Sequence, residues 1–256
     1  MTQALVLKPA VSGPWLRVAS LVLFVLVWEV AAELAQSRAL PTPWQVAASM
    51  ANHLAAGTLL ADLAITLFRV AVAFVFAMLI GVAVGMLMGL RERVNLFLDG
   101  WLILFLNLPA LVVIILCYVW FGLTEAAAIL AVALNKIPNV IVITREGTRA
   151  IERELLQVAQ VFHVTRTRRF FVFFLPQLYP YMMAAARTGI ALIWKIVLVV
   201  ELLGRSDGIG FQLSVFFQLF DIAGILAYTL AFVAVMLTIE LALLAPLERH
   251  LTRWRK

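Results

Sequence analysis

The sequence predicts an all-α, polytopic membrane protein with six transmembrane helices and one amphipathic helix outside the bilayer. Hydrophobic residues make up 64% of the chain and charged residues only 13%, with a mean hydropathy of +1.04. Soluble domains are about half apolar and about a quarter charged. The apolar residues fall into runs of membrane length, and a charged segment with helical periodicity separates the fourth run from the fifth. Residues 1–256 are therefore predicted to form a single transmembrane domain.

Each predicted span is an apolar run close to the roughly 20 residues that a helix needs to cross a bilayer. The spans are Trp15–Leu34, Leu63–Leu90, Leu96–Phe121, Glu125–Ile143, Ala184–Leu203 and Ile222–Pro246. The first run is too long for a signal-peptide core, and Glu29 and Glu33 interrupt any cleavage-like sequence, so it is predicted to remain as a helix. Pro109 and Pro138 each remove a backbone hydrogen bond inside a span, which predicts either an ordinary kink or a broken helix that lines a pathway.

Loop charges predict the orientation of the chain. Basic residues precede the first span and follow the second, fourth and sixth, whereas the loops on the other side contain only Arg38 and Arg205. The positive-inside rule places the first side, and with it both termini, in the cytoplasm. Because the net charge of +6 lies in these loops, it indicates membrane lipid and not nucleic acid as a partner.

Residues 145–180 are predicted to form a cytoplasmic loop that contains a short amphipathic helix. Its apolar positions recur at helical spacing and are Ile151, Leu155, Val158, Ala159 and Phe162. An apolar stripe outside the bilayer needs a cover, which can be the rest of this chain, the membrane surface or a partner protein. The residues alone leave these three covers open.

Enzyme chemistry has no recognisable motif in this sequence. No Gly-rich phosphate loop is followed by Lys and Ser or Thr, and no serine lies in a nucleophile-elbow pattern. His53, His163 and His250 lie far apart without other metal-ligating residues at ligand spacing, so no metal site is expected. Cys117 is the single cysteine and can form no intrachain disulfide. We therefore expect no catalytic residue and no cofactor in this chain.

The cytoplasmic loop resembles the EAA signature of ATP-binding cassette importer permeases. On this chain the Glu position of the signature is Gln157, and its two Ala positions are Val158 and Ala159. The Gly position is His163, and the remaining positions are Phe173, Leu175 and Pro176. The spacing fits without a gap, whereas only Ala159, Leu175 and Pro176 match in identity. His163 is a departure, because glycine adopts left-handed backbone geometry far more readily than histidine.

Further landmarks resemble the branch of this family that serves nitrate, taurine and aliphatic sulfonates. They occur in the same order along almost the whole chain: Leu40-Pro41-Thr42-Pro43, Thr66-Leu67-Phe68-Arg69, Trp120-Phe121-Gly122, Gly147, Leu175 to Pro180, Arg187, Glu201 and Gly208-Ile209-Gly210. The resemblance implies a type I importer permease in the bacterial inner membrane. It also implies two ATPase subunits that bind ATP and Mg, a second permease copy that makes a homodimer, and a periplasmic or lipid-anchored solute-binding protein.

In this family the cytoplasmic helix seats on the ATPase, so the resemblance assigns ATPase coupling to one segment of the loop. The coupling residues are Leu155, Leu156, Gln157, Val158, Ala159, Phe162, His163, Val164, Thr165 and Arg166. The resemblance also implies import of a small anion such as nitrate, taurine or an alkanesulfonate. A thiamine precursor or another small heterocycle is the alternative solute, and a secondary transporter is the alternative class.

Ionisable residues inside the spans are candidates for the translocation pathway, because each is costly in a bilayer unless it faces a pathway or a partner. Lys195 lies near the middle of the fifth span, where it suits an anion in the pathway or a structural pair with Glu240 or Glu29. Glu201 occupies a family position near the outer gate. Arg69 is a further pathway candidate, although its place near a span end favours a structural anchor.

Overall fold

The computed structural model describes residues 14–244 and residue 246, and within these residues every regular element is a helix. The α-helices are α1 (Pro14–Ala35), α2 (Pro43–Ala55), α3 (Thr58–Leu90), α4 (Glu92–Asn107), α5 (Ala110–Phe121), α6 (Glu125–Arg149), α7 (Arg153–Val161), α8 (Arg166–Arg169), α9 (Leu175–Gly204), α10 (Ile209–Gln218) and α11 (Ile222–Ile239). Two π-helical turns, Phe170–Phe174 and Glu240–Leu244, precede α9 and follow α11. The predicted all-α class is confirmed.

The described helices give five or six apolar spans, depending on how one bent pair is counted. Five helices are long and apolar enough to cross a membrane, and α4 with α5 brings the number to six if the pair is one span. The predicted span Leu96–Phe121 is broken at Pro109, which is one of the two alternatives predicted there, because α4 and α5 meet at an angle of 98°. Leu108 has an extended backbone with ψ of 126°, as expected for the residue before Pro109, so the helix ends there. Pro138, in contrast, lies within the unbroken α6.

Helix ends differ from the predicted span ends because helices continue beyond the apolar runs. Helix α3 begins at Thr58 and not at Leu63, and its 33 residues span about 50 Å, more than the roughly 30 Å of a bilayer core. Helix α9 begins at Leu175, before the predicted Ala184. The last residues of the predicted sixth span include Ala245, which lies outside the described part of the chain.

Two short helices, α2 and α10, lie in connections where Pro41, Pro43, Gly208 and Gly210 predict irregular structure. The α2 helix begins with a capping box, in which the Thr42 hydroxyl accepts a hydrogen bond from the Gln45 amide at 3.3 Å and the Gln45 side chain accepts one from the Thr42 amide. The pattern Thr-x-x-Gln is a sequence signal for a helix start. Residues 36–42 and 205–208 are irregular, but the chain is helical from Pro43 and from Ile209 onward, so this expectation is correct only in part.

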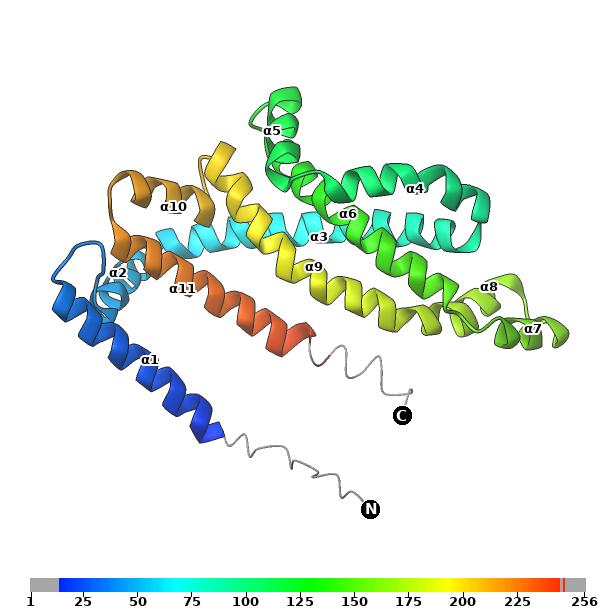
Figure 1. Ribbon diagram of the computed structural model, residues 1–256, viewed down its shortest axis with the longest axis horizontal. Coiled ribbons are helices and arrows are strands. Elements are labelled where there is room, and N and C mark those ends of the chain that lie inside the picture. The colour runs from blue at the N-terminus through cyan, green and yellow to red at the C-terminus, as the bar shows by residue number, and fades with distance from the viewer. Residues whose placement is uncertain (1–13, 245, 247–256) are drawn as a thin grey trace, which may run out of the picture.

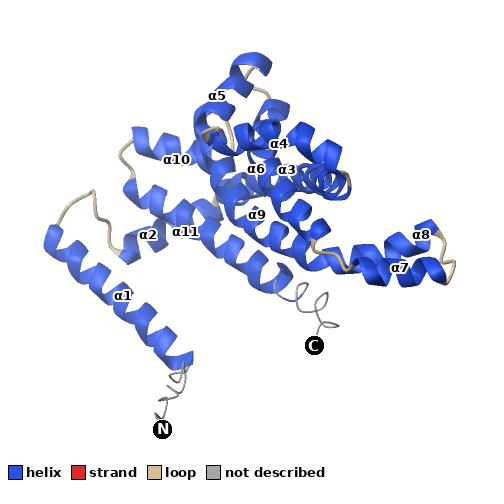
Figure 2. Cartoon of the chain, turned by 45° about the vertical axis from the view of Figure 1, so that its right-hand side comes forward, coloured by secondary structure: helices blue, strands red, loops and turns tan. Residues whose placement is uncertain are grey.

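Helices α3, α6 and α9 form the centre of the molecule (Figure 1). Helices α7 and α8 project beyond the C-terminal end of α6 and the N-terminal end of α9, and we call this end of the molecule the α7 end (Figures 1 and 2). Helices α2 and α10 lie at the opposite end, which we call the α10 end. Helix α1 stands apart from the bundle in both views. Only 6% of residues Val18–Ala35 of this helix are buried. The Trp28 indole donates a hydrogen bond to the Pro41 carbonyl at 3.0 Å.

Three glycines allow α3 and α6 to pack closely. A β-carbon at Gly81, Gly85 or Gly89 would come within 2.8 Å or less of side-chain atoms on α6. The opposing residues are Val140, Thr144 and Thr148. Glycines at intervals of four lie on one helix face and permit backbones to approach, as in many membrane helix pairs.

Candidate functional site

Helix α7 is held on the α7 end of the bundle by one side only. The Glu152 amide donates to the Gln177 side chain at 3.0 Å, which ties the start of α7 to α9. Ile151 is buried in a cluster with Phe174 and Leu178, and Leu156 packs partly against it. Ala159 is also buried. This chain therefore covers Ile151, Leu156 and Ala159 of the loop's apolar residues.

The other apolar side chains of α7 and its C-terminal end are open. Val161 and Phe162 are 74% and 77% exposed, and Leu155 and Val158 are also exposed. The interpretation that the stripe packs on the chain's own helix ends is therefore correct only in part. What remains is a contiguous patch of Leu155, Val158, Val161 and Phe162, which we call the α7 patch.

His163 builds the bend that a glycine would build. Its φ is +52°, in the left-handed region. The His163 amide donates to the Gln160 carbonyl at 3.0 Å, and the Val164 amide donates to the Ala159 carbonyl at 3.0 Å. This pair of bonds is a Schellman motif, which ends a helix by a left-handed residue. The chain thus makes the same turn with histidine, at a cost of about 1–2 kcal/mol in backbone strain.

The remaining predicted coupling residues surround this bend. Gln157, Thr165 and Arg166 are exposed, and Val164 is half-buried. Thr165 precedes α8, and Arg169 at the end of α8 donates to the Gln160 side chain at 3.4 Å. The loop after the bend therefore returns to α7 and presents its polar residues beside the α7 patch.

A network of buried charges closes the α10 end and is centred on Arg69. The guanidinium donates from Nε and Nη2 to both oxygens of Glu125 at 2.7 and 2.9 Å, and from Nη1 to Glu201 at 2.8 Å. It also donates to the carbonyl and the carboxylate of Asp207 at 3.1 and 2.5 Å. All five donor hydrogens of the arginine are therefore used. Arg205 joins the network by an ion pair with Glu125 at 2.9 Å.

The backbone after α9 is fastened to the same network. The Gly210 amide and the Thr66 hydroxyl both donate to Glu201, at 2.8 and 3.0 Å. The Gly208 amide donates to Asp62 at 3.1 Å. Gly208 has φ of +95°, and a β-carbon there would come within 2.6 Å of the Glu201 carboxylate, so this turn requires glycine. The network therefore joins α3, the start of α6, the end of α9 and the start of α10.

The three predicted pathway residues do not lie together. Arg69 and Glu201 are buried and bind each other, whereas Lys195 is exposed on the surface of α9. The Lys195 ammonium lies 5.6 Å from the centre of the Trp194 ring. The alternative pair with Glu240 is not formed, since Glu240 lies 3.5 Å from Arg187. Within the described residues Lys195 has no ion pair.

Lys136 is a buried charge that the sequence reasoning missed. It lies in the middle of α6 and is 2% exposed. It is the only charged residue between Glu125 and Arg145, and this isolated charge within a predicted span was the sequence signal for it. Across from it, a β-carbon on Gly189 of α9 would come 3.0 Å from the lysine Cε.

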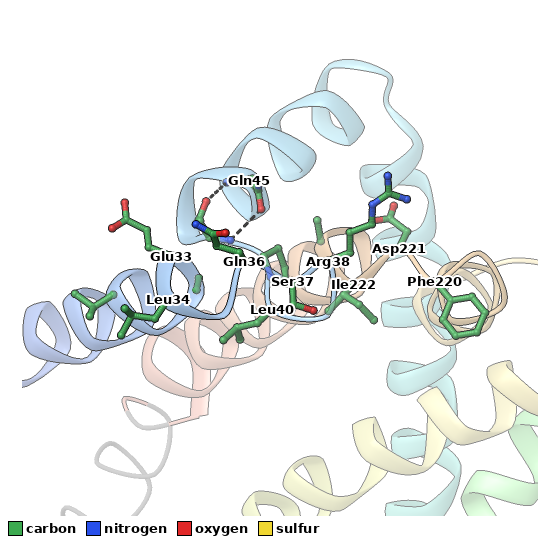
Figure 3. A pocket seen from close by; sticks show the side chains of 15 residues that line it. Glu33, Leu34, Gln36, Ser37, Arg38, Leu40, Gln45, Phe220, Asp221 and Ile222 are labelled. Atoms are coloured by element: carbon green, nitrogen blue, oxygen red, sulfur yellow. Dashed lines mark hydrogen bonds between the residues drawn. The ribbon is translucent and has the colours of Figure 1, made fainter.

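A cavity of about 990 Å³ opens at the α10 end, apart from these groups. It is bordered by the end of α1, the connection to α2 and the turn between α10 and α11 (Figure 3). Its charged lining residues are Glu33, Arg38 and Asp221. None of the predicted pathway residues lines it. As for metals, no three His, Cys, Asp or Glu side chains converge on a metal-binding geometry within residues 14–244.

Comparison with known proteins supplies a family and a fold. Residues 77–253 match the family described as "Binding-protein-dependent transport system inner membrane component". The putative aliphatic sulfonates transport permease protein SsuC of Bacillus subtilis (strain 168) is 28% identical over 233 residues, which cover 90% of this chain and 84% of that protein. The taurine transport system permease protein TauC of Escherichia coli (strain K12) is 28% identical over 239 residues, 91% of this chain and 86% of that protein.

Two further matches agree with these. The bicarbonate transport system permease protein CmpB of Synechococcus elongatus is 32% identical over 148 residues, 57% of this chain and 53% of that protein. An inward-facing structure of the MetNI methionine ABC transporter contains a chain that aligns with a TM-score of 0.64 at 16% identity. The alignment covers 74% of this chain and 94% of that one, and at this identity it demonstrates a shared fold.

Proposed function

Because this chain belongs to the family of inner membrane components of binding-protein-dependent transport systems, we propose that it forms the translocation pathway of an ATP-binding cassette importer for a small anion. The pathway would lie between two copies of the chain. Two ATPase subunits, which bind ATP and Mg, would dock on the α7 end, and an external solute-binding protein, periplasmic or lipid-anchored, would dock on the α10 end. The α7 end and both termini would then face the cytoplasm, in agreement with the loop charges.

The α7 patch is the observation that carries this proposal. Leu155, Val158, Val161 and Phe162 are exposed on a short helix that lies beyond the ends of α6 and α9. A single amphipathic helix with an open apolar face fits a groove on a partner protein. The bond from Glu152 to Gln177 and the packing of Ile151 against Leu178 fix the start of α7 to α9, so a push on α7 is passed to the span.

The solute class rests on charge and on the relatives. Lys195 gives the exposed face of α9 a cation near the middle of the bilayer, without an ion pair among the described residues. Aliphatic sulfonates, taurine and bicarbonate, which the names of the relatives give, all carry an anionic oxygen group. A cation inside a low-dielectric pathway favours such solutes.

The Arg69 network suits a clamp at the external side of the pathway. It joins three spans through the buried Arg69 guanidinium, whose five donors bind carboxylates of Glu125, Glu201 and Asp207 and the Asp207 carbonyl, so opening would break several of these bonds together. In this role Arg69 and Glu201 control opening and do not contact the solute.

The proposal is tested by replacing Phe162 with Glu and purifying the chain with its co-expressed ATPase. Loss of the ATPase from the complex, with the permease still folded in detergent, is expected because a carboxylate would be buried in an apolar groove. Phe220→Glu is the matched control, because Phe220 is 81% exposed but lies next to α11 at the α10 end. Equal ATPase recovery with both variants would refute the docking assignment.

Uptake into proteoliposomes tests the solute class. Complexes with the solute-binding protein are supplied with labelled taurine, ethanesulfonate, nitrate or bicarbonate, each against an uncharged thiamine-precursor pyrimidine. ATP-dependent uptake of at least one anion is expected. Uptake of the pyrimidine alone would assign the chain to heterocycle import instead.

A further inference from the structure

Lys136 is buried at mid-membrane depth. It follows Glu125, the first residue of α6, by eleven positions, which corresponds to about 16 Å along the helix axis. That is about half of the roughly 30 Å hydrocarbon core. The side chain is 2% exposed, so the bundle encloses almost all of it.

No counter-charge from the described part of the chain accompanies this lysine. Within the described residues Lys136 forms no hydrogen bond and no ion pair, whereas the equally buried Arg69 has three carboxylate partners. An ionised side chain in a bilayer is costly unless it finds a partner or a water-filled cavity. A structural role alone would be served better by an apolar residue of the same volume.

The surroundings of Lys136 keep space for its head group on the side of α9. Gly189 lies opposite, and a β-carbon there would stand 3.0 Å from the lysine Cε, 3.8 Å from Nζ and 3.4 Å from the ring of Phe74. The missing side chain at Gly189 is therefore what admits the end of the lysine between α6 and α9. The preceding residue, Thr188, is exposed on the open face of α9, which also carries Lys195.

We propose that Lys136 is an anion-binding residue of the translocation pathway, held behind α9 in this conformation and exposed to the solute when α9 moves relative to α6. The transported anion is then the missing counter-charge. This inference rests on the proposed import of an anion. It adds a second cation, on a different helix from Lys195. Gly189, which lies opposite Lys136, is one to two turns nearer the α7 end of α9 than Lys195 is.

Cysteine chemistry provides the test, because Cys117 is the only native cysteine and can be removed by Cys117→Ala. In that background Lys136→Met and Lys136→Cys are purified with the ATPase and assayed with labelled taurine, ethanesulfonate, nitrate and bicarbonate. We expect both variants to assemble normally and to lose at least tenfold in uptake of the anion that the parent complex carries. Asn135→Met is the matched control, because Asn135 is the neighbouring polar residue and bonds only to the Ala131 carbonyl of its own helix.

Chemical rescue separates charge from packing. Aminoethyl methanethiosulfonate adds an ammonium to the cysteine of Lys136→Cys, whereas methyl methanethiosulfonate adds a neutral group. We expect only the first reagent to restore uptake, and we expect it to react faster during ATP-driven turnover than without ATP. Saturating anion should slow the reaction.

Each outcome decides the inference. If the parent complex carries none of the four anions, the proposed function fails before Lys136 is tested. If it carries one and Lys136→Met transports normally, only the role of Lys136 is refuted. Equal rescue by both reagents, or a Lys136→Met complex that fails to assemble, would show that the side chain has a structural task and would also overturn the inference.

Discussion

Replacing Arg69 by methionine should destabilise the protein more than any neutralisation of a single partner in its network. Glu201 is 0% exposed at its side chain, whereas Glu125 and Asp207 are 39% and 41% exposed. Once the guanidinium is gone, Glu125 and Asp207 can recruit water, but Glu201 keeps an uncompensated buried charge. Removing one partner of such a pair costs about 3–5 kcal/mol. The partly exposed partners add little because solvent screens them.

A second substitution should reverse part of this loss. Gln at position 201 removes the buried charge while its amide oxygen still accepts from Thr66 and Gly210. Arg69→Met/Glu201→Gln is therefore expected to be more stable than Arg69→Met alone, by about 1–3 kcal/mol, the cost of an unsatisfied buried polar group. The two residues then show a coupling energy in a double-mutant cycle.

The assay is equilibrium unfolding of the purified chain in mixed micelles with increasing dodecyl sulfate, followed by far-ultraviolet circular dichroism. Arg69→Lys provides an intermediate point, because three donors can serve Glu201 but not all the other acceptors as well. If the double variant is no more stable than Arg69→Met, the buried charge on Glu201 is not the source of the loss and the clamp is wrongly described.

Three further predictions concern other parts of the chain. His163→Gly should leave uptake intact and stabilise the protein by up to about 1 kcal/mol, because relief of left-handed strain slightly exceeds the entropy lost by glycine; a loss of uptake would show that the imidazole itself contacts a partner. Gly85→Leu should abolish folded protein in size-exclusion chromatography, since even a β-carbon comes 2.8 Å from Thr144 and from the Ile141 carbonyl. Folded Gly85→Leu protein would contradict the close packing of α3 on α6. Lys195→Met should lower anion uptake about tenfold, the value of one charged contact of about 1.4 kcal/mol, with unchanged unfolding in dodecyl sulfate; normal uptake by an unstable variant would indicate a structural role.

Much of the fold was predictable from local sequence because the bilayer imposes a simple rule. A run of apolar residues near membrane length must be helical there, and the ends of such runs are marked by charges and prolines. Pro109 showed where a helix could not continue, although not that α4 and α5 would meet at 98°. The capping box of Thr42 and Gln45 would have revealed α2 if the connection had been searched for it.

Among the candidate functional residues, predictability depended on how far apart the members of a site lie along the chain. The resemblance to the family signature predicts the coupling residues, which lie next to one another along the chain. The partners of Arg69 could not be identified, because Glu125, Glu201 and Asp207 are 56 to 138 residues away along the chain. The left-handed turn at His163 was also beyond reach, since histidine rarely adopts that backbone geometry and only the Schellman bonds reveal it.

The sequence by itself determined that this protein is helical, that it crosses the membrane several times, and that an amphipathic helix lies between two of its spans. Only the tertiary structure decided which charges neutralise each other, which apolar residues of α7 stay open, and that Lys136 has no partner among residues 14–244. The physical reason is that hydrophobic length and periodicity are properties of consecutive residues. Burial and ion pairing depend instead on residues that the packing of α3, α6 and α9 brings together.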